Sequence, residues 1–202
     1  MSSSDLPEIW LARHGETAWS RTGRHTGRTD VPLEPEGEAQ AARLAARLHG
    51  LEFAEVWTSP RERARRTAEI AGFGARAQVV EDLAEWNYGE FEGLRRAEIE
   101  GFALGWDVFK DGAPGGESAE EAAARADRVV ARLRAVSGDV LVFGHGHFLR
   151  TLGARWIELP VSFASRLLLS TASVSVLGYE HGPRDPAIKL WNDVHHLTEE
   201  TP

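Results

Sequence analysis

Two histidines in this chain each follow a short apolar run that stops abruptly at charge or glycine. His14 comes after residues 9–12 and Arg13, and His145 comes after residues 140–143. Runs of this kind predict buried strands, and α/β proteins build their sites in the loops that follow parallel strands. If the two strands are neighbours, the two imidazoles face each other beside a guanidinium. These residues alone also fit an ordinary surface loop. A catalytic site is favoured only if other loops supply further reactive side chains at the same sheet edge.

Two other loops offer the partners that a phosphoryl-transfer site needs. Arg63 follows the strand expected over residues 55–58, and Glu85 follows the strand expected over 78–80. A neutral imidazole can attack phosphorus in line, while guanidiniums hold the non-bridging oxygens through bidentate hydrogen bonds. A carboxylic acid can donate a proton to the leaving oxygen. The set therefore points to phosphoryl transfer through a histidine.

The same side chains allow other uses. His145 and His147 form a His-x-His pair, a pattern that also occurs in metal sites. No carboxylate or further histidine stands in a matching place near the first motif, so we expect neither a metal nor another cofactor. Glu16 and Glu92 are alternative acids if Glu85 points away from the site.

The expected elements alternate between strand and helix. Strands are expected over residues 9–12, 55–58, 78–80, 139–143, 173–179 and 187–191, and helices over 35–48, 61–71, 94–110, 117–136 and 148–157. Ser118 should cap the helix over 117–136, and Thr58 or Ser59 the helix over 61–71. The alternation predicts a largely parallel sheet with helices on both faces, and the last two strands predict an antiparallel edge. Outside these elements we expect loops over 17–34 and 81–93, and surface positions for Asp193, His195 and His196.

The composition limits the classes of protein that the chain can belong to. It has 202 residues, no cysteine and a formal net charge of −8. The length fits a single domain over residues 1–202, and the acidic balance argues against nucleic-acid binding, which needs a basic face. Lack of cysteine excludes disulfides and thiolate catalysis. The chain shows no secretory signal and no apolar run of membrane length, so we expect a cytoplasmic protein without a membrane partner.

Four motifs give a more specific resemblance. They are RHGET at 13–17, TSPRERARRTA at 58–68, EWNYGEFEG at 85–93 and GHG at 144–146. In type and order they resemble the histidine phosphatase superfamily, in its phosphoglycerate-mutase-like branch. The resemblance implies a three-layer α/β/α sandwich around a six-stranded, mostly parallel sheet with one antiparallel edge strand.

The resemblance also implies a role for each residue. His14 would be the nucleophile that forms a phosphohistidine, Arg13, Arg63 and His145 would hold the phosphate, and Glu85 would be the proton donor. Weaker correspondences suggest further substrate contacts at Ser20, Thr26, Gly27, Tyr88, Arg96, Gly146 and His147. For Arg96, a solvated helix face is an equal alternative.

The chain lacks one feature of the mutases in this family. Residues 94–138 show no inserted lid segment, and His147 stands where mutases usually have asparagine. A more open pocket admits water, so we expect a phosphomonoesterase that acts on a small phosphorylated sugar or glycolytic acid, best at mildly acidic pH. Cofactor-dependent phosphoglycerate mutase and a non-catalytic relative that binds phosphorylated ligands are the alternatives. Because relatives are frequently dimeric, a homodimer is possible.

Overall fold

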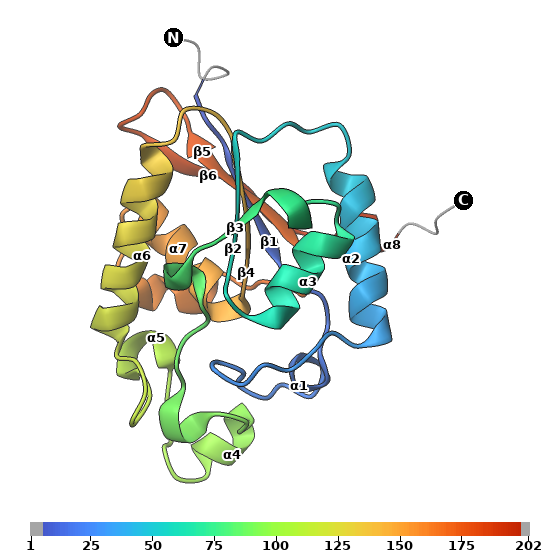
Figure 1. The fold of residues 1–202 in the computed structure, drawn as a ribbon. Helices are drawn as coiled ribbons and strands as arrows, with labels where there is room; N and C mark the ends of the chain where they lie inside the picture. Colours follow the sequence, from blue (N-terminus) through green and yellow to red (C-terminus); the bar gives the residue numbers. More distant parts are fainter. Residues whose placement is uncertain (1–5, 199–202) are drawn as a thin grey trace.

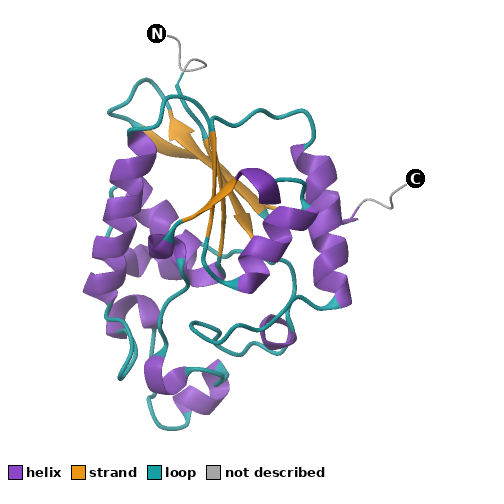
Figure 2. Ribbon diagram, viewed as in Figure 1, coloured by secondary structure: helices purple, strands orange, loops and turns teal. Residues whose placement is uncertain are grey.

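A six-stranded mixed sheet forms the centre of the protein, with helices on both faces (Figure 1, Figure 2). This is a computed structural model, and it describes residues 6–198. The strand order is β3-β2-β4-β1-β5-β6. The strands are β1 (Ile9–Arg13), β2 (Glu55–Thr58), β3 (Ala77–Val79), β4 (Val140–Gly144), β5 (Val174–Tyr179) and β6 (Pro186–Asp193). The expected three-layer sandwich is confirmed.

Pairing in the sheet brings the two histidine loops to the same edge. β1 pairs parallel with β4 in a register that joins Ile9 to Val140 and Arg13 to Gly144. The two strands therefore end level, and the residues that follow emerge side by side. β5 pairs antiparallel with both β1 and β6, which gives the expected antiparallel edge.

The helices lie in two layers, with shorter segments beyond the carboxyl edge of β1. The helices are α1 (Ala18–Arg21), α2 (Pro35–Leu48), α3 (Glu62–Ile70), α4 (Arg96–Glu100), α5 (Val108–Asp111), α6 (Ala119–Arg134), α7 (Gly146–Trp156) and α8 (His195–Thr198). Single 3₁₀ segments cover Gly74–Arg76, Glu81–Leu83, Gly89–Phe91 and Val161–Arg166. α6 and α7 cover one face of the sheet, and α2 and α3 cover the other (Figure 1). None of the helices in residues 6–198 is long and apolar enough to cross a bilayer.

β4 is buried on both faces because successive side chains alternate between the two helical layers. Val140 and Val142 join the cluster beneath α6 and α7. Leu141 and Phe143 join the cluster beneath α2 and α3. Burial on both sides explains why this strand reads as a continuous apolar run.

Helix starts follow the expected capping in one case and depart from it in another. The Ser118 hydroxyl accepts the N–H of Glu121, and the Glu121 carboxylate accepts the N–H of Ser118, which confirms the cap of α6. The expected cap of α3 by Thr58 or Ser59 is wrong, because the N-cap is Arg61. The Ser59 N–H still bonds to a carbonyl of β4 at 3.0 Å, so the chain turns only after that residue.

The single helix expected over 94–110 is wrong. α4 and α5 are separated by a turn in which Gly105 adopts a φ of 77°, in the left-handed region. The Asp107 side chain then accepts the N–H of Phe109 and starts a new helix. The broken segment wraps beyond the sheet edge instead of covering a face (Figure 1).

The end of the described chain folds back onto α2. His196 is only 8% exposed, and its Nε2 donates to the carbonyl of Ala172 at 3.0 Å. Asp193 forms an ion pair with Arg47 on α2 at 3.2 Å. The expected surface position of His196 is therefore wrong, because β6 runs far enough to deliver α8 against α2. His195 is exposed.

A close backbone approach fixes the loop that carries His14. A Cβ on Gly15 would lie 2.2 Å from the Gly37 carbonyl oxygen, at the start of α2. We expect Gly15→Ala to lower the free energy of unfolding by about 1–3 kcal/mol, as overpacking commonly does. Gly182→Ala is the matched control, because its Cβ would meet nothing within 4 Å. Equal urea-unfolding midpoints for the two variants would contradict the close approach.

Candidate active site

The two histidines face each other at the carboxyl edge of β1 and β4. Their ring centroids are 5.2 Å apart, with the planes tilted by 58°. The backbone N–H of His14 donates to the Gly144 carbonyl at 3.0 Å, which ties the two loops together. The expected pairing of the imidazoles is therefore confirmed.

Hydrogen bonding fixes the tautomer of His14. Its Nδ1 lies 2.7 Å from the carbonyl oxygen of Gly15, and because a carbonyl only accepts, the ring proton is on Nδ1. Nε2 then carries the lone pair. Burial holds the pKa of His14 well below 6.5, and the charges of Arg63 and Arg13 lower it further. The ring is therefore neutral at physiological pH, with a lone pair that can act as a nucleophile.

His145 forms a hydrogen bond with the side chain of Ser59. Its Nε2 lies 2.6 Å from the Ser59 hydroxyl, while its buried Nδ1 has no hydrogen-bond partner in the described part of the chain. Burial first, and then Arg63, keeps the pKa of His145 well below 6.5. The free Nδ1 is an unsatisfied polar atom beside His14.

Two guanidiniums flank the histidines, that of Arg63 buried and that of Arg13 partly exposed at the cavity. Arg13 lies against the backbone of Gly146, where an added Cβ would be 3.2 Å from Cζ. Arg63 is completely buried and donates to the carbonyls of Thr26 at 2.9 Å and Thr29 at 3.1 Å. Within residues 6–198 neither arginine forms an ion pair, and the Nε of each is buried without a partner. Burial lowers the pKa of both guanidiniums.

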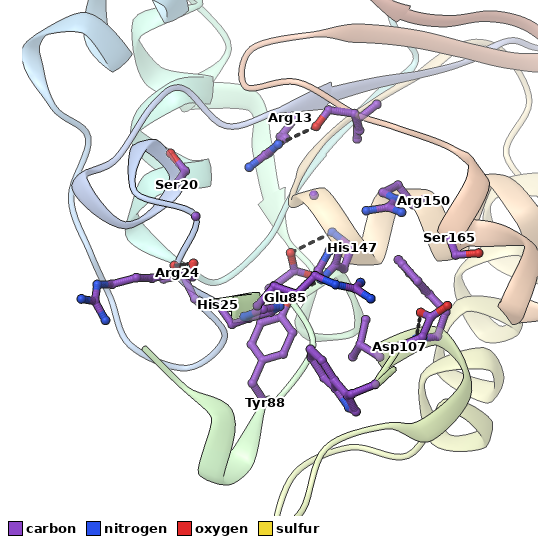
Figure 3. A pocket seen from close by; sticks show the side chains of 18 of the residues that line it. Arg13, Ser20, Arg24, His25, Glu85, Tyr88, Asp107, His147, Arg150 and Ser165 are labelled. Carbon is purple, nitrogen blue, oxygen red and sulfur yellow. Dashed lines mark hydrogen bonds between the residues drawn. The ribbon is translucent and has the colours of Figure 1, made fainter. Parts of the chain in front are cut away.

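Glu85 is anchored to the start of α7. Its Oε1 accepts the N–H groups of Trp86 at 2.9 Å and Phe148 at 2.8 Å, and its Oε2 accepts the N–H of His147 at 2.9 Å. These bonds hold the carboxyl group at the positive end of a helix. Figure 3 shows the contact with His147 at the cavity.

The alternative acids lie elsewhere. Glu92 accepts the N–H groups of Gly27 at 2.9 Å and Thr29 at 3.0 Å, so it braces the preceding loop. Glu16 lies 3.9 Å from Arg21 at the surface. Glu85 lines the cavity, and these two glutamates do not.

His14 lines a cavity of about 340 Å³, and Figure 3 labels ten of the other residues around this cavity. The sequence-predicted residues that line it are Arg13, His14, Ser20, Thr26, Glu85, Tyr88, Arg96, Gly146 and His147. Arg63, His145 and Gly27 are buried and are not among the residues that line it. Gly27 must be glycine because a Cβ would lie 2.2 Å from the Trp86 carbonyl oxygen.

The weaker predicted contacts have partners of their own. The Ser20 hydroxyl donates to the Thr17 carbonyl at 3.1 Å, and the Thr26 hydroxyl donates to the Arg24 carbonyl at 3.1 Å. Arg96 lines the cavity but also pairs with Glu100 at 2.9 Å on an exposed helix face. Arg96 therefore lies both at the cavity, as a substrate contact would, and on a solvated helix face.

Buried Tyr88 and half-buried His147 form a pair in the cavity wall. The Tyr88 hydroxyl oxygen lies 2.6 Å from the His147 Nδ1. Burial raises the pKa of Tyr88 well above 10, so the phenol is neutral. Burial and the charge of Arg150 lower the pKa of His147 well below 6.5.

Sequence reasoning missed several lining residues, including Arg150 and His25. Arg150 extends from α7, with its Nε donating to the Ala164 carbonyl at 2.9 Å and its Cζ 4.5 Å from the Phe109 ring centroid. It stands three residues after His147, and this helical spacing was the available signal. His25 lies in a polar loop that carried no such signal. Arg24, Asp107 and Ser165 also line the cavity.

The described residues offer no evident metal site. No group of three or more histidine, aspartate or glutamate side chains in residues 6–198 is placed to hold an ion. Independence from metals remains a prediction. The positive charge near His14 comes from Arg13 and Arg63, and together these groups can bind an oxyanion next to a nucleophile.

The buried histidines predict a pH-dependent stability. As the pH falls through 6.5, the unfolded chain takes up protons that folded His14, His145 and His147 do not, so the free energy of unfolding falls. Each group contributes up to about 1.4 kcal/mol per pH unit.

Between pH 7 and pH 5, we therefore expect His147→Asn to reduce the slope of the free energy of unfolding against pH by up to about 1.4 kcal/mol per pH unit. Urea unfolding at a series of pH values measures it. His49→Asn is the matched control because His49 is exposed. If His147→Asn and His49→Asn kept the same slope, the lowered pKa of His147 would be contradicted.

Comparison with known proteins adds an independent line of evidence. A family model described as "Histidine phosphatase superfamily (branch 1)" matches residues 9–194. The chain is 43% identical over 184 residues to an acid phosphatase of Mycobacterium tuberculosis, covering 89% of this chain and 90% of that protein. It is 33% identical over 187 residues to sedoheptulose 1,7-bisphosphatase of Saccharomyces cerevisiae, covering 77% and 69%.

Two further similarities extend this picture. The chain is 32% identical over 203 residues to a probable phosphoglycerate mutase GpmB of Cronobacter sakazakii, covering 94% of each. The solved structure of the open reading frame Rv3214 from Mycobacterium tuberculosis superimposes with a TM-score of 0.87 at 41% identity. That match covers 92% of this chain and 97% of that one.

Proposed function

The chain belongs to branch 1 of the histidine phosphatase superfamily, and we propose that it hydrolyses small phosphomonoesters through a phosphohistidine on His14. One observation carries the proposal. A neutral imidazole with a free Nε2 stands beside the guanidiniums of Arg13 and Arg63, which have no carboxylate partner within the described chain. This arrangement sets a group that can attack phosphorus beside groups that can bind an anion.

The proposed first half of the reaction forms the phosphohistidine. The phosphate of the ester is held by Arg13, Arg63 and His145, and their positive charge and hydrogen bonds stabilise its oxygens in the transition state. The His14 Nε2 forms a bond to phosphorus as the bond to the leaving oxygen breaks. Protonated Glu85 gives its proton to that oxygen, and the alcohol leaves.

The second half returns the site to its starting state. The Glu85 carboxylate takes a proton from a water molecule, whose oxygen attacks the phosphorus. The bond to His14 Nε2 breaks, and inorganic phosphate leaves. The neutral imidazole and the protonated acid are both restored. No metal enters these steps, because Arg13 and Arg63 supply the positive charge.

Phosphorylated sugars or glycolytic acids are the substrate class we propose. The similarity to an acid phosphatase and to a sedoheptulose 1,7-bisphosphatase supports hydrolysis of such esters. Similarity to a probable phosphoglycerate mutase keeps mutase activity as the alternative. Both activities use His14 and differ in whether water or a second phosphoglycerate accepts the phosphoryl group. A cytoplasmic location and a homodimer also stay predictions.

If Glu85 is the proton donor, the loss of activity in Glu85→Gln should depend on the leaving group of the substrate. p-Nitrophenolate leaves without a proton, whereas the alkoxide of glycerol 3-phosphate needs one. We expect Glu85→Gln to lower kcat/KM for glycerol 3-phosphate by about 10²–10⁴-fold, and to lower it far less for p-nitrophenyl phosphate.

Glu16→Gln is the matched control, because Glu16 belongs to the same motif as His14 but does not line the cavity. It should leave both rates unchanged. Equal losses on the two substrates for Glu85→Gln would remove Glu85 from the role of acid. A leaving-group-dependent loss in Glu16→Gln would assign that role to Glu16.

A further inference from the structure

The part of the cavity away from Arg13 is walled by aromatic rings, and His25 is at their centre. Its ring centroid lies 4.9 Å from that of Tyr88 and 5.2 Å from that of Trp106, both edge-on. The His147 ring is 5.8 Å away. Figure 3 shows His25 and Tyr88 across the cavity from Arg13. An ester whose phosphate meets Arg13 and His14 therefore places its alcohol half near this wall.

The backbone fixes how His25 presents its ring. Its Nδ1 lies 2.8 Å from the Leu94 carbonyl oxygen, so the ring proton is on Nδ1 and Nε2 carries the lone pair. The backbone N–H of His25 donates to the same carbonyl at 2.9 Å, which anchors the residue. Burial lowers the pKa of His25, so the ring stays neutral and Nε2 can only accept.

Nε2 of His25 is free to meet a ligand. It has no hydrogen-bond partner among the described residues, and it is not among the side-chain atoms sealed from solvent. The ring lines the same cavity as His14. An acceptor without a partner thus faces the space that the alcohol half of a substrate occupies.

The side chains around His25 Nε2 indicate which chemical group of a ligand can bind there. Donors outnumber carboxylates among the charged side chains that line the cavity, with carboxylates at Glu85 and Asp107 and guanidiniums at Arg13, Arg24, Arg96 and Arg150. A carboxylate or phosphate oxygen would suit them but has no proton for His25. A hydroxyl group both donates and accepts, so it fits an acceptor set among donors.

We propose that His25 is a specificity-determining residue that accepts a hydrogen bond from a hydroxyl group on the alcohol half of the substrate. The preferred substrates are then phosphomonoesters of polyols, which include sugars. This inference rests on the proposed phosphatase function. A site that hydrogen-bonds a substrate hydroxyl discriminates against an analogue that lacks it, because its own polar atom is left unpaired.

Glycerol 3-phosphate and propyl phosphate test the inference directly. They share a three-carbon chain and the same charge, and they differ in hydroxyl groups. We expect wild-type kcat/KM to favour glycerol 3-phosphate by about 10-fold or more. His25→Phe keeps a ring against Tyr88 and Trp106 but removes the acceptor. It should lower kcat/KM for glycerol 3-phosphate by a similar factor and affect propyl phosphate far less.

Two more variants separate hydrogen bonding from packing. His25→Gln carries an amide oxygen that can accept, so it should restore part of the preference that His25→Phe loses. His49→Phe is the control for the substitution itself, since His49 is exposed and outside the cavity. It should leave both rates and the preference unchanged.

The outcomes distinguish this inference from the function on which it rests. Equal wild-type kcat/KM for the two esters would overturn the role of His25. This comparison uses only the wild-type protein, so it does not depend on whether a variant folds. Equal losses on both esters in His25→Phe would also overturn it, because they would show a packing role. Failure of the wild-type protein to hydrolyse either ester would instead overturn the proposed function.

Discussion

Positive charge that is buried without a counter-ion is the constraint on which the site depends. Arg13 and Arg63 lie within the protein beside His14 and His145, and no carboxylate of the described chain pairs with them. Burying such charges is costly, and an anion that enters the site offsets the cost. The same burial and charges keep both imidazoles neutral. A protein with a net charge of −8 thereby holds an anion site at one sheet edge.

One helix start organises much of this site. α7 begins directly after His145, and its first N–H groups hold the carboxyl group of Glu85. Gly146, its first residue, lets the Arg13 guanidinium lie against the backbone. Parallel pairing of β1 with β4 sets His14 at the same level. His14, Arg13 and Glu85 are therefore positioned by a strand pair and one helix N-terminus, which are rigid elements.

The sequence predicts what depends on local pattern. Apolar runs predict the strands. The residues that follow these runs predict that Arg13, His14, Glu85 and His145 lie at one edge of the sheet. The helix over 94–110 failed because Gly105 turns left-handed and Asp107 starts a new helix. His25 and the burial of His196 depend on contacts between segments far apart in sequence, which no local pattern encodes. The roles of the site residues remain predictions until they are measured.

The central claim is that the phosphoryl group passes through His14, and trapping it tests this most directly. Wild-type protein is mixed with radiolabelled p-nitrophenyl phosphate, quenched in base within one turnover and digested for peptide mapping. We predict a label that is stable in base, labile in acid and located on the peptide containing His14, and that is absent from His14→Ala. Turnover at the wild-type rate in His14→Ala, or a label on another residue, would contradict the account.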